Sequence, residues 1–158
     1  MKSLPLALVA AFASTACATV PPADSVESIS FETGPCFGAC PVYRVTVNSE
    51  GGGTFEGRRF TAVTGTRSFR ATPEQFRAFA ARLAPLRPAS GERRLTGDAC
   101  EMMATDQPTA DVTWRSGASE QKFYFYYGCD MEKHRPIAER LDAAPGLLPI
   151  GEFIRNPE

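Results

Sequence analysis

Apolar and polar residues alternate along several short stretches of the chain, which is the pattern of half-buried β-strands. The clearest stretch is residues 42–47, where the odd-numbered positions from Tyr43 to Val47 are apolar and share one side. Further stretches with strand character are residues 26–33, 54–63, 67–71, 108–115 and 120–127. Short turns join neighbouring stretches, so we expect a mainly antiparallel sheet of about five to six strands.

Helical spacing replaces this alternation after Thr72. Thr72 can cap a helix, Pro73 fits its first turn and Gln75 completes a capping box. The apolar face of this helix consists of Phe76, Phe79, Ala80, Leu83 and Leu86, before Pro85 and Pro88 end it. A shorter helix is expected at residues 135–143, and residues 145–154 should dock on the domain. The predicted fold class is α+β, with one long helix packed on the sheet and a shorter C-terminal helix.

Bulky residues of the predicted strands are the candidate core, above all Phe55, Phe60, Val112 and Trp114. Residues 123–127 are aromatic at every position, which fits a central strand covered on both faces. An exposed aromatic row that binds sugars is the alternative. Residues 88–107 have no regular pattern and are expected to form a long irregular segment, which a disulfide from Cys100 would tie down.

The start of the chain has the pattern of an export signal. Lys2 gives a positive start, an apolar stretch runs to Ala13, and small residues precede Cys17. Ser14 to Cys17 resembles a bacterial lipobox, in which Cys17 becomes the lipidated first residue, although Ser14 stands where leucine is usual. Ordinary signal cleavage after Ala18 is the alternative.

We therefore expect a signal peptide of lipoprotein type at residues 1–17, a tether at 18–25 and a single α+β domain at 26–158. The lipid would anchor the domain to a membrane. Ala18, in place of an aspartate, points by the same resemblance to the outer membrane, facing the periplasm; a soluble periplasmic protein is the alternative. The formal net charge of −1 argues against a nucleic-acid partner, which would need a clear excess of Lys and Arg.

Cys36 and Cys40 lie in a turn that is flanked by prolines and runs directly into the strand at residue 42. Residues four apart reach disulfide distance when the chain turns between them. Export leaves four cysteines in an oxidising compartment, for which three pairings exist. We favour Cys36–Cys40 with Cys100–Cys129, because the first pair is already close in sequence.

Other chemistry at Cys36 and Cys40 remains open. A redox-active dithiol would need a lowered thiolate pKa, usually from a helix N-terminus or a nearby cation, whereas a strand follows here. Cys-x-x-x-Cys-Pro also resembles the copper-binding motif of the Sco copper chaperones, which add a distant histidine, and His134 is the only histidine. That motif belongs to a thioredoxin-like fold with a helix after the cysteines. We therefore predict no metal or other cofactor, and expect His134 to be a surface residue near a helix start.

Two groups of charges could contact partners. Between residues 57 and 97 lie nine arginines and two acids, which could face lipid headgroups or a cell-wall polymer; a solvated surface is the simpler interpretation. A Cys100–Cys129 bond would gather four carboxylates that could bind a hard cation or act in acid–base catalysis, with solvated loops again the simpler interpretation. These carboxylates belong to Asp98, Glu101, Asp130 and Glu132.

The motif Gly-Pro-Cys-Phe-Gly-x-Cys-Pro-x-Tyr at residues 34–43 is followed by Asp-x-Pro-Thr at residues 106–109 and an aromatic strand ending at Tyr127. Together they resemble a family of bacterial envelope proteins described as domain of unknown function 6438. The resemblance implies the compartment and fold but no particular reaction.

The same resemblance implies that the bridge in the cysteine turn is self-contained and that Cys100–Cys129 is an addition in this chain. It also makes Tyr43, Asp106 and Thr109 candidate site residues. Asp106 could instead cap the turn before the strand through an Asx-type hydrogen bond.

The sequence thus predicts an exported envelope protein that acts as a binding or structural module, with an envelope protein or cell-wall polymer as candidate partner. One alternative is a thiol-redox or copper-handling protein that uses Cys36 and Cys40. Another is a hydrolase with acidic residues near Asp106. No catalytic residue is predicted, and nothing in the sequence names a substrate.

Overall fold

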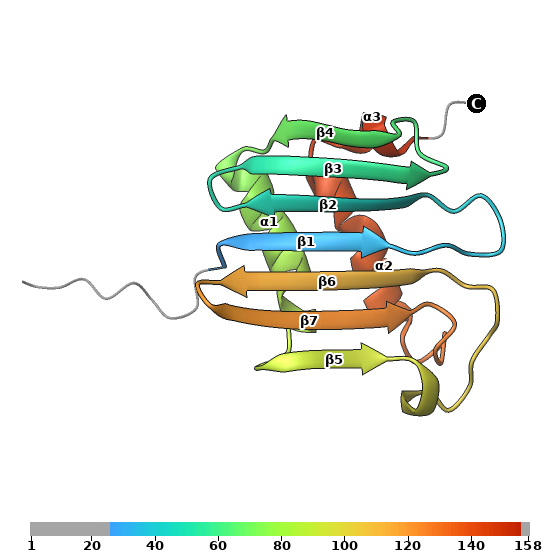
Figure 1. Ribbon diagram of the computed structural model, residues 1–158. Helices are drawn as coiled ribbons and strands as arrows, with labels where there is room; N and C mark the ends of the chain where they lie inside the picture. The colour runs from blue at the N-terminus through green and yellow to red at the C-terminus, as the bar shows by residue number, and fades with distance from the viewer. Residues whose placement is uncertain (1–25, 156–158) are drawn as a thin grey trace, which may run out of the picture.

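The computed structural model describes residues 26–155, which fold into a sheet with helices packed on one of its faces (Figure 1). Within these residues the sheet has seven strands in the order β4-β3-β2-β1-β6-β7-β5. The strands are β1 (Ser28–Thr33), β2 (Val42–Asn48), β3 (Gly52–Arg59), β4 (Gly65–Arg70), β5 (Gly91–Leu95), β6 (Thr109–Ser116) and β7 (Ser119–Tyr126). The helices are α1 (Pro73–Leu83), α2 (Arg135–Ala143) and α3 (Gly151–Ile154), with 3₁₀ turns η1 (Ala84–Leu86), η2 (Gly97–Ala99) and η3 (Pro145–Leu147). The predicted signal peptide and tether, residues 1–25, lie outside the described residues.

The predicted sheet was wrong in strand number and direction. Strand β5 lies within residues 88–107, which were expected to be irregular, and it pairs in parallel with β7, so the sheet is mixed. Its sequence Gly-Glu-Arg-Arg-Leu does not alternate, and only Leu95 is buried. The strand forms because its backbone groups pair with the neighbouring strand, which does not require a hydrophobic pattern. Arg94 covers the ring of Tyr124, with 3.9 Å from its guanidinium carbon to the ring centroid.

The prediction of one long helix was also wrong. The capping box is present, because Thr72 accepts the Gln75 N–H and the Gln75 side chain accepts the Thr72 N–H. Helix α1 nevertheless has only 11 residues and α2 has nine. Pro85 lacks an N–H and its ring crowds the preceding turn, so the chain continues as the 3₁₀ turn η1. Among residues 26–155, no helix is both long and apolar enough to cross a membrane.

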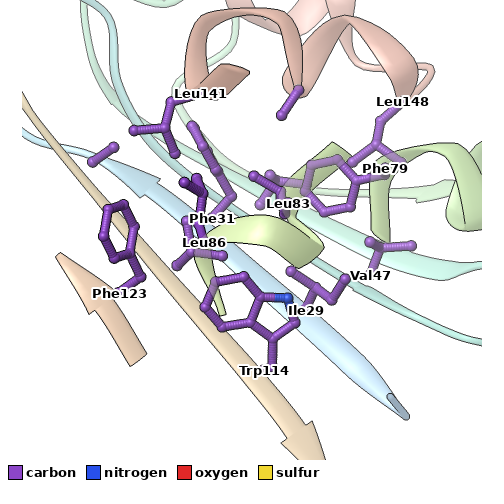
Figure 2. Packing of buried hydrophobic residues seen from close by; sticks show 14 of the residues in the cluster. Ile29, Phe31, Val47, Phe79, Leu83, Leu86, Trp114, Phe123, Leu141 and Leu148 are labelled. Atoms are coloured by element: carbon purple, nitrogen blue, oxygen red, sulfur yellow. The ribbon is translucent and has the colours of Figure 1, made fainter. Parts of the chain in front are cut away.

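The core fills the space between the sheet and the helices (Figure 2). Val112 and Trp114 of β6 are at most 1% exposed, as predicted. Phe79 and Leu83 of α1 and Leu141 of α2 are fully buried on the other side of this layer. Burial of one such side chain contributes about 1.5–3 kcal/mol, so the helices are held mainly by their apolar faces.

Two predictions for aromatic residues were wrong. Phe60 is 38% exposed and has a φ of 53°, because β3 ends one residue earlier and the chain turns. Strand β7 is not covered on both faces: Phe123 and Phe125 are buried in the core, whereas Tyr124 and Tyr126 alternate with them and are partly exposed. In Figure 1, α1 and α2 lie behind the sheet, and its other face, here called the uncovered face, carries no helix of the described residues.

Candidate functional site

A disulfide closes the turn between β1 and β2. Cys36 and Cys40 are bonded, with 5.8 Å between their Cα atoms, as predicted. The first half of the loop is fixed to the start of β6 and to the segment before it: Gly34 N–H donates to the Thr109 carbonyl at 2.9 Å, and Phe37 N–H donates to the Asp106 carbonyl at 3.0 Å. The turn therefore lies against the segment that carries the Asp-x-Pro-Thr motif.

Thr33 holds the base of the same turn. Its hydroxyl donates to the Pro41 carbonyl at 2.7 Å and accepts the Tyr43 N–H at 3.1 Å. These bonds join the end of β1 to the start of β2, where the β2–β3 register shifts between Val42 and Tyr43. The direction of the Tyr43 side chain is thus fixed by the disulfide turn and its hydrogen bonds.

A cavity of about 250 Å³ opens behind this turn, and we call it the Tyr43 pocket. Its walls come from β1, the cysteine turn, β2, the segment before β6, the end of β7 and the C-terminal helical region. The lining residues are Phe31, Thr33, Cys40, Pro41, Tyr43, Pro108, Thr109, Tyr127, Leu141, Asp142, Pro145 and Ile154. Most of these side chains are apolar, and the polar ones are hydroxyls and one carboxylate.

Tyr43 is the most buried polar residue of the pocket. It is 4% exposed, and its ring stacks on Phe55 at 5.3 Å and lies 6.4 Å from Phe31. Burial raises the pKa of its hydroxyl, and the negative charge of Asp142 raises it further. The hydroxyl therefore stays protonated, yet it has no hydrogen-bond partner among residues 26–155. Among the described residues the only fully buried side-chain polar atom without a partner is the Ser116 hydroxyl, so the Tyr43 oxygen is not sealed inside the protein, and a group in the cavity could bond to it.

Tyr127 and Asp142 supply two further polar groups of the pocket. The Tyr127 hydroxyl donates to Asp142 Oδ1 at 2.6 Å. Burial raises the pKa of Tyr127, with further contributions from the Asp142 hydrogen bond and from the neighbouring Tyr43. No sequence pattern pointed to this pair: Tyr127 ends an aromatic run, and Asp142 resembles any other acid on an exposed helix face.

The structure brings together two of the three predicted candidates. Tyr43 and Thr109 both line the pocket, whereas Asp106 does not. Asp106 has a φ of 66°, and its exposed carboxylate accepts the Thr105 hydroxyl at 3.2 Å. Its carbonyl, which binds Phe37 N–H, makes the contact with the cysteine turn. The predicted Asx-type cap is not among the hydrogen bonds of the described residues.

The second disulfide joins Cys100 to Cys129, with 5.3 Å between their Cα atoms. The bond brings Asp130 to the loop after η2, where its carboxylate accepts the N–H groups of Glu101 at 3.0 Å and Met102 at 2.7 Å. These hydrogen bonds lower the pKa of the Asp130 carboxyl. Of the other acids, Glu101 pairs with Lys133 at 3.0 Å, and Glu132 pairs with Arg135.

Cys129, Asp130 and His134 place potential ligand atoms within 4.8 Å of one another. Each group already has another role: the sulfur is in a disulfide, the carboxylate accepts two N–H groups, and His134 Nδ1 lies 2.9 Å from the Cys129 carbonyl. The expectation of a surface histidine was wrong, because His134 is 9% exposed and its ring packs edge-on against Phe125. His134 is also not a lining residue of the pocket that contains Cys40.

The uncovered face carries a second cavity of about 420 Å³. The charged side chains of this face are largely paired across neighbouring strands. Glu32 pairs with Arg44 and Arg58, and Glu120 pairs with Arg115 at 2.8 Å. The arginine-rich region between residues 57 and 97 contributes further pairs, with Arg77 bound to Glu74 and Arg94 to Glu92. Three of the nine arginines of that region, Arg58, Arg77 and Arg94, thus have acidic partners, and Arg77 lies on α1 rather than on this face. Because the charges of the uncovered face pair with one another across the strands, this face is a weaker candidate than the Tyr43 pocket.

The fold and the pocket define a small two-layer domain with one sheet, helices on one face and two disulfides. A family model described as Domain of unknown function (DUF6438) matches residues 27–144, and the chain belongs to this family. The match spans β1 to the end of α2 and includes both disulfides and all pocket residues except Pro145 and Ile154. No curated protein and no solved structure matches the chain.

Proposed function

We propose that the protein is an exported, lipid-anchored binding module of the bacterial envelope, and that its binding site is the Tyr43 pocket. Two disulfides support an oxidising compartment, since such bonds are rare in the cytosol. The export signal at residues 1–17 and the lipobox-like Ser14 to Cys17 support a lipid anchor on Cys17. Residues 18–25 would then tether a single domain, residues 26–158, beside the outer membrane.

The unpartnered hydroxyl of Tyr43 carries the proposal. Tyr43 is 4% exposed and lines the cavity, and its hydroxyl bonds to no other group of residues 26–155, so a ligand atom in the cavity could form a hydrogen bond with it. The rest of the pocket fits the same role, because a few convergent polar groups in apolar walls are typical of small-ligand sites.

Binding has more support than catalysis. The raised pKa values of Tyr43 and Tyr127 keep both hydroxyls protonated, so neither is a base or nucleophile near neutral pH. A hydrolase that uses Asp106 has less support, because this carboxylate is exposed and outside the pocket. A thiol-redox role has less support as well, because β2 rather than a helix follows Cys40.

The anchor is tested by mass spectrometry of protein purified from its native membrane. The expected result is a lipid mass on an N-terminal Cys17, with both disulfides intact, and loss of membrane association in Cys17→Ser. Cys17→Ala serves as a second variant, because either change removes the acceptor thiol. A mature protein that begins after Ala18 without lipid would contradict the anchor and leave a soluble periplasmic protein.

The site is tested with protein that carries ¹³C-labelled tyrosine rings. Fragments of several charge types are added, and the ring signals of Tyr43, Tyr127 and Tyr124 are followed by NMR. We expect at least one fragment to shift the Tyr43 and Tyr127 signals and to leave the signal of Tyr124 unchanged, because Tyr124 lies on the uncovered face. Fragments that shift only Tyr124 would move the binding site to the uncovered face.

A further inference from the structure

We infer that the Tyr43 pocket takes a primary ammonium group on a short aliphatic stem, with Tyr43, Tyr127 and Asp142 as its hydrogen-bond partners. This inference rests on the proposed function, because it names the ligand of the same site. It is carried by the charge of the pocket, the arrangement of its oxygen atoms and its size.

Among residues 26–155, Asp142 is the only charged residue that lines the pocket. No Lys, Arg or His is among the lining residues, so a carboxylate or phosphate ligand would have no cation to pair with and would meet a negative charge. A cation would be attracted, and a charge-assisted hydrogen bond to Asp142 is stronger than a bond between neutral groups. The charge of the lining residues therefore predicts a positively charged ligand.

Three of the oxygen-bearing groups that line the pocket belong to Tyr43, Tyr127 and Asp142. The Tyr127 hydroxyl donates to Oδ1, which leaves the Tyr127 oxygen able to accept and the second carboxylate oxygen without a partner from the described residues. Tyr43, Tyr127 and Asp142 all line the same cavity of about 250 Å³, so one small ligand can reach all three groups. A primary ammonium donates three hydrogen bonds, and these three groups can each accept one.

Other cations match the oxygen atoms of Tyr43, Tyr127 and Asp142 less well. A guanidinium has five N–H donors in a planar fork and prefers a carboxylate with both oxygens free, whereas Oδ1 of Asp142 already accepts from Tyr127. A quaternary ammonium donates no hydrogen bond, so the Tyr43 hydroxyl would remain without a partner. The primary ammonium is therefore the cation whose hydrogen-bond donors best match the oxygen atoms of Tyr43, Tyr127 and Asp142.

The apolar walls fit the stem of such a ligand. Phe31, Leu141 and the rings of three prolines form the remainder of the lining together with Ile154, Cys40 and two threonines. A volume of about 250 Å³ lies below the range of about 300–1,000 Å³ that is usual for drug-sized ligands, so the ligand is small. A lysine side chain from a peptide and a free alkylamine both have this chemistry.

The inference is tested by NMR titration of full-length mature protein with n-pentylammonium and with Nα-acetyl-lysine N-methylamide. Pentanoate, 1-pentanol and tetramethylammonium are the matched probes of other charge and hydrogen-bonding type. We expect the two primary ammonium probes to shift the Tyr43 and Tyr127 ring signals, and the other three to bind at least about tenfold more weakly, because charged hydrogen bonds are lost. Tighter binding of the lysine derivative would favour a peptide source, and tighter binding of pentylammonium a free amine.

Two near-isosteric variants separate the ligand contacts from the fold. Asp142→Asn keeps an acceptor for Tyr127 but removes the charge, and it should weaken pentylammonium binding about tenfold or more. Tyr43→Phe should weaken it about three- to tenfold. Glu139→Gln, an exposed acid on the same helix α2 and outside the pocket, should change affinity less than about twofold, because surface charges are screened.

The titrations distinguish an error in the ligand class from an error in the location of the binding site. If pentanoate or 1-pentanol shifts the Tyr43 and Tyr127 signals at lower concentration than pentylammonium, the site stands and the ammonium inference is wrong. Equal affinity of Asp142→Asn and the unaltered protein for pentylammonium would overturn it too. If none of the five probes nor any fragment moves these two signals, both the inference and the proposed site fail.

Discussion

Gly34 donates its backbone N–H to the Thr109 carbonyl at 2.9 Å, and a Cβ atom at Gly34 would collide with the Thr109 hydroxyl. The contact joins the start of the cysteine turn to the first residue of β6, two segments far apart in the chain. The φ of Gly34 is not in the left-handed region, so the need for glycine here comes from the close approach and not from backbone conformation.

Gly34→Ala should therefore lower the free energy of unfolding by about 1–3 kcal/mol, the usual cost of overpacking. The collision is with a side-chain atom, so Thr109→Ala in the same protein should recover part of the loss. Chemical denaturation of the two single variants and the double variant measures the coupling. Additive losses would show that the crowding at Gly34 has another source.

The two disulfides should contribute unequally to stability. In the chain-entropy model, the bridge between Cys100 and Cys129, which are 29 residues apart, contributes about 3–4 kcal/mol. The bridge between Cys36 and Cys40, with a separation of four, contributes only about 2 kcal/mol. Urea unfolding of the paired Cys→Ser variants should show the larger loss for Cys100 and Cys129.

Removal of the Cys36–Cys40 bond should lower the free energy of unfolding less than removal of Cys100–Cys129, but it should also loosen the cysteine turn locally. Without the Cys36–Cys40 bond, amide exchange of Phe37 and Gly34 should accelerate, because their hydrogen bonds hold a loop that is no longer closed. An unchanged melting temperature and unchanged exchange in Cys36→Ser/Cys40→Ser would contradict a scaffolding role for this bond.

Asp111 and Glu32 are directly opposite on β6 and β1 of the uncovered face. Partial burial, followed by the charge of Glu32, raises the pKa of Asp111 above its ordinary value. The folded state therefore favours the protonated acid, and the ionised acid costs stability once the pH has risen through the raised folded-state pKa. Like charges opposite each other cost about 0.2–1 kcal/mol.

Asp111→Asn should thus raise the melting temperature at pH 7. The gain should shrink as the pH falls through the raised pKa towards the ordinary aspartate value of about 3.9, and it should shrink in high salt. Glu139→Gln is the matched control. A gain that is the same at pH 7 and pH 3 would mean that charge is not the cause.

Asp130 has the opposite pH dependence. Two backbone N–H groups lower the pKa of its carboxyl, so the ionised form stabilises the fold at every pH above the ordinary aspartate pKa. This contribution is lost as the pH falls from about 3.9 through the lowered folded-state value. Asn tolerates the φ of 41° at this position, which makes Asp130→Asn a suitable variant.

Asp130→Asn should lower the melting temperature at neutral pH, and its difference from the unaltered protein should narrow in acid. Asp98→Asn changes an exposed acid of η2 without a hydrogen bond in the described residues and should have little effect at any pH. Thermal unfolding by circular dichroism at pH 7 and pH 3 measures both. A difference that widened in acid would contradict the sign of the pKa shift.

Local patterns were sufficient for the elements that bury one regular face. Alternation predicted strand β2, with Tyr43, Val45 and Val47 buried, and the capping box predicted the start of α1. The family resemblance is confirmed by the family match. The spacing of the cysteines also gave both disulfides, because a short turn already brings Cys36 and Cys40 within reach.

Segments whose side chains repeat with a strand or helix period were thus predictable from the amino-acid order alone, since burial of one face is encoded within each segment. Three features became visible only in the folded molecule: the parallel pairing of β5, the burial of His134, and the shared pocket of Tyr43, Tyr127 and Asp142. The physical reason is that these features depend on where distant segments pack. Backbone pairing at a sheet edge and the convergence of β2, the end of β7 and α2 on one cavity leave no periodic signal in the chain.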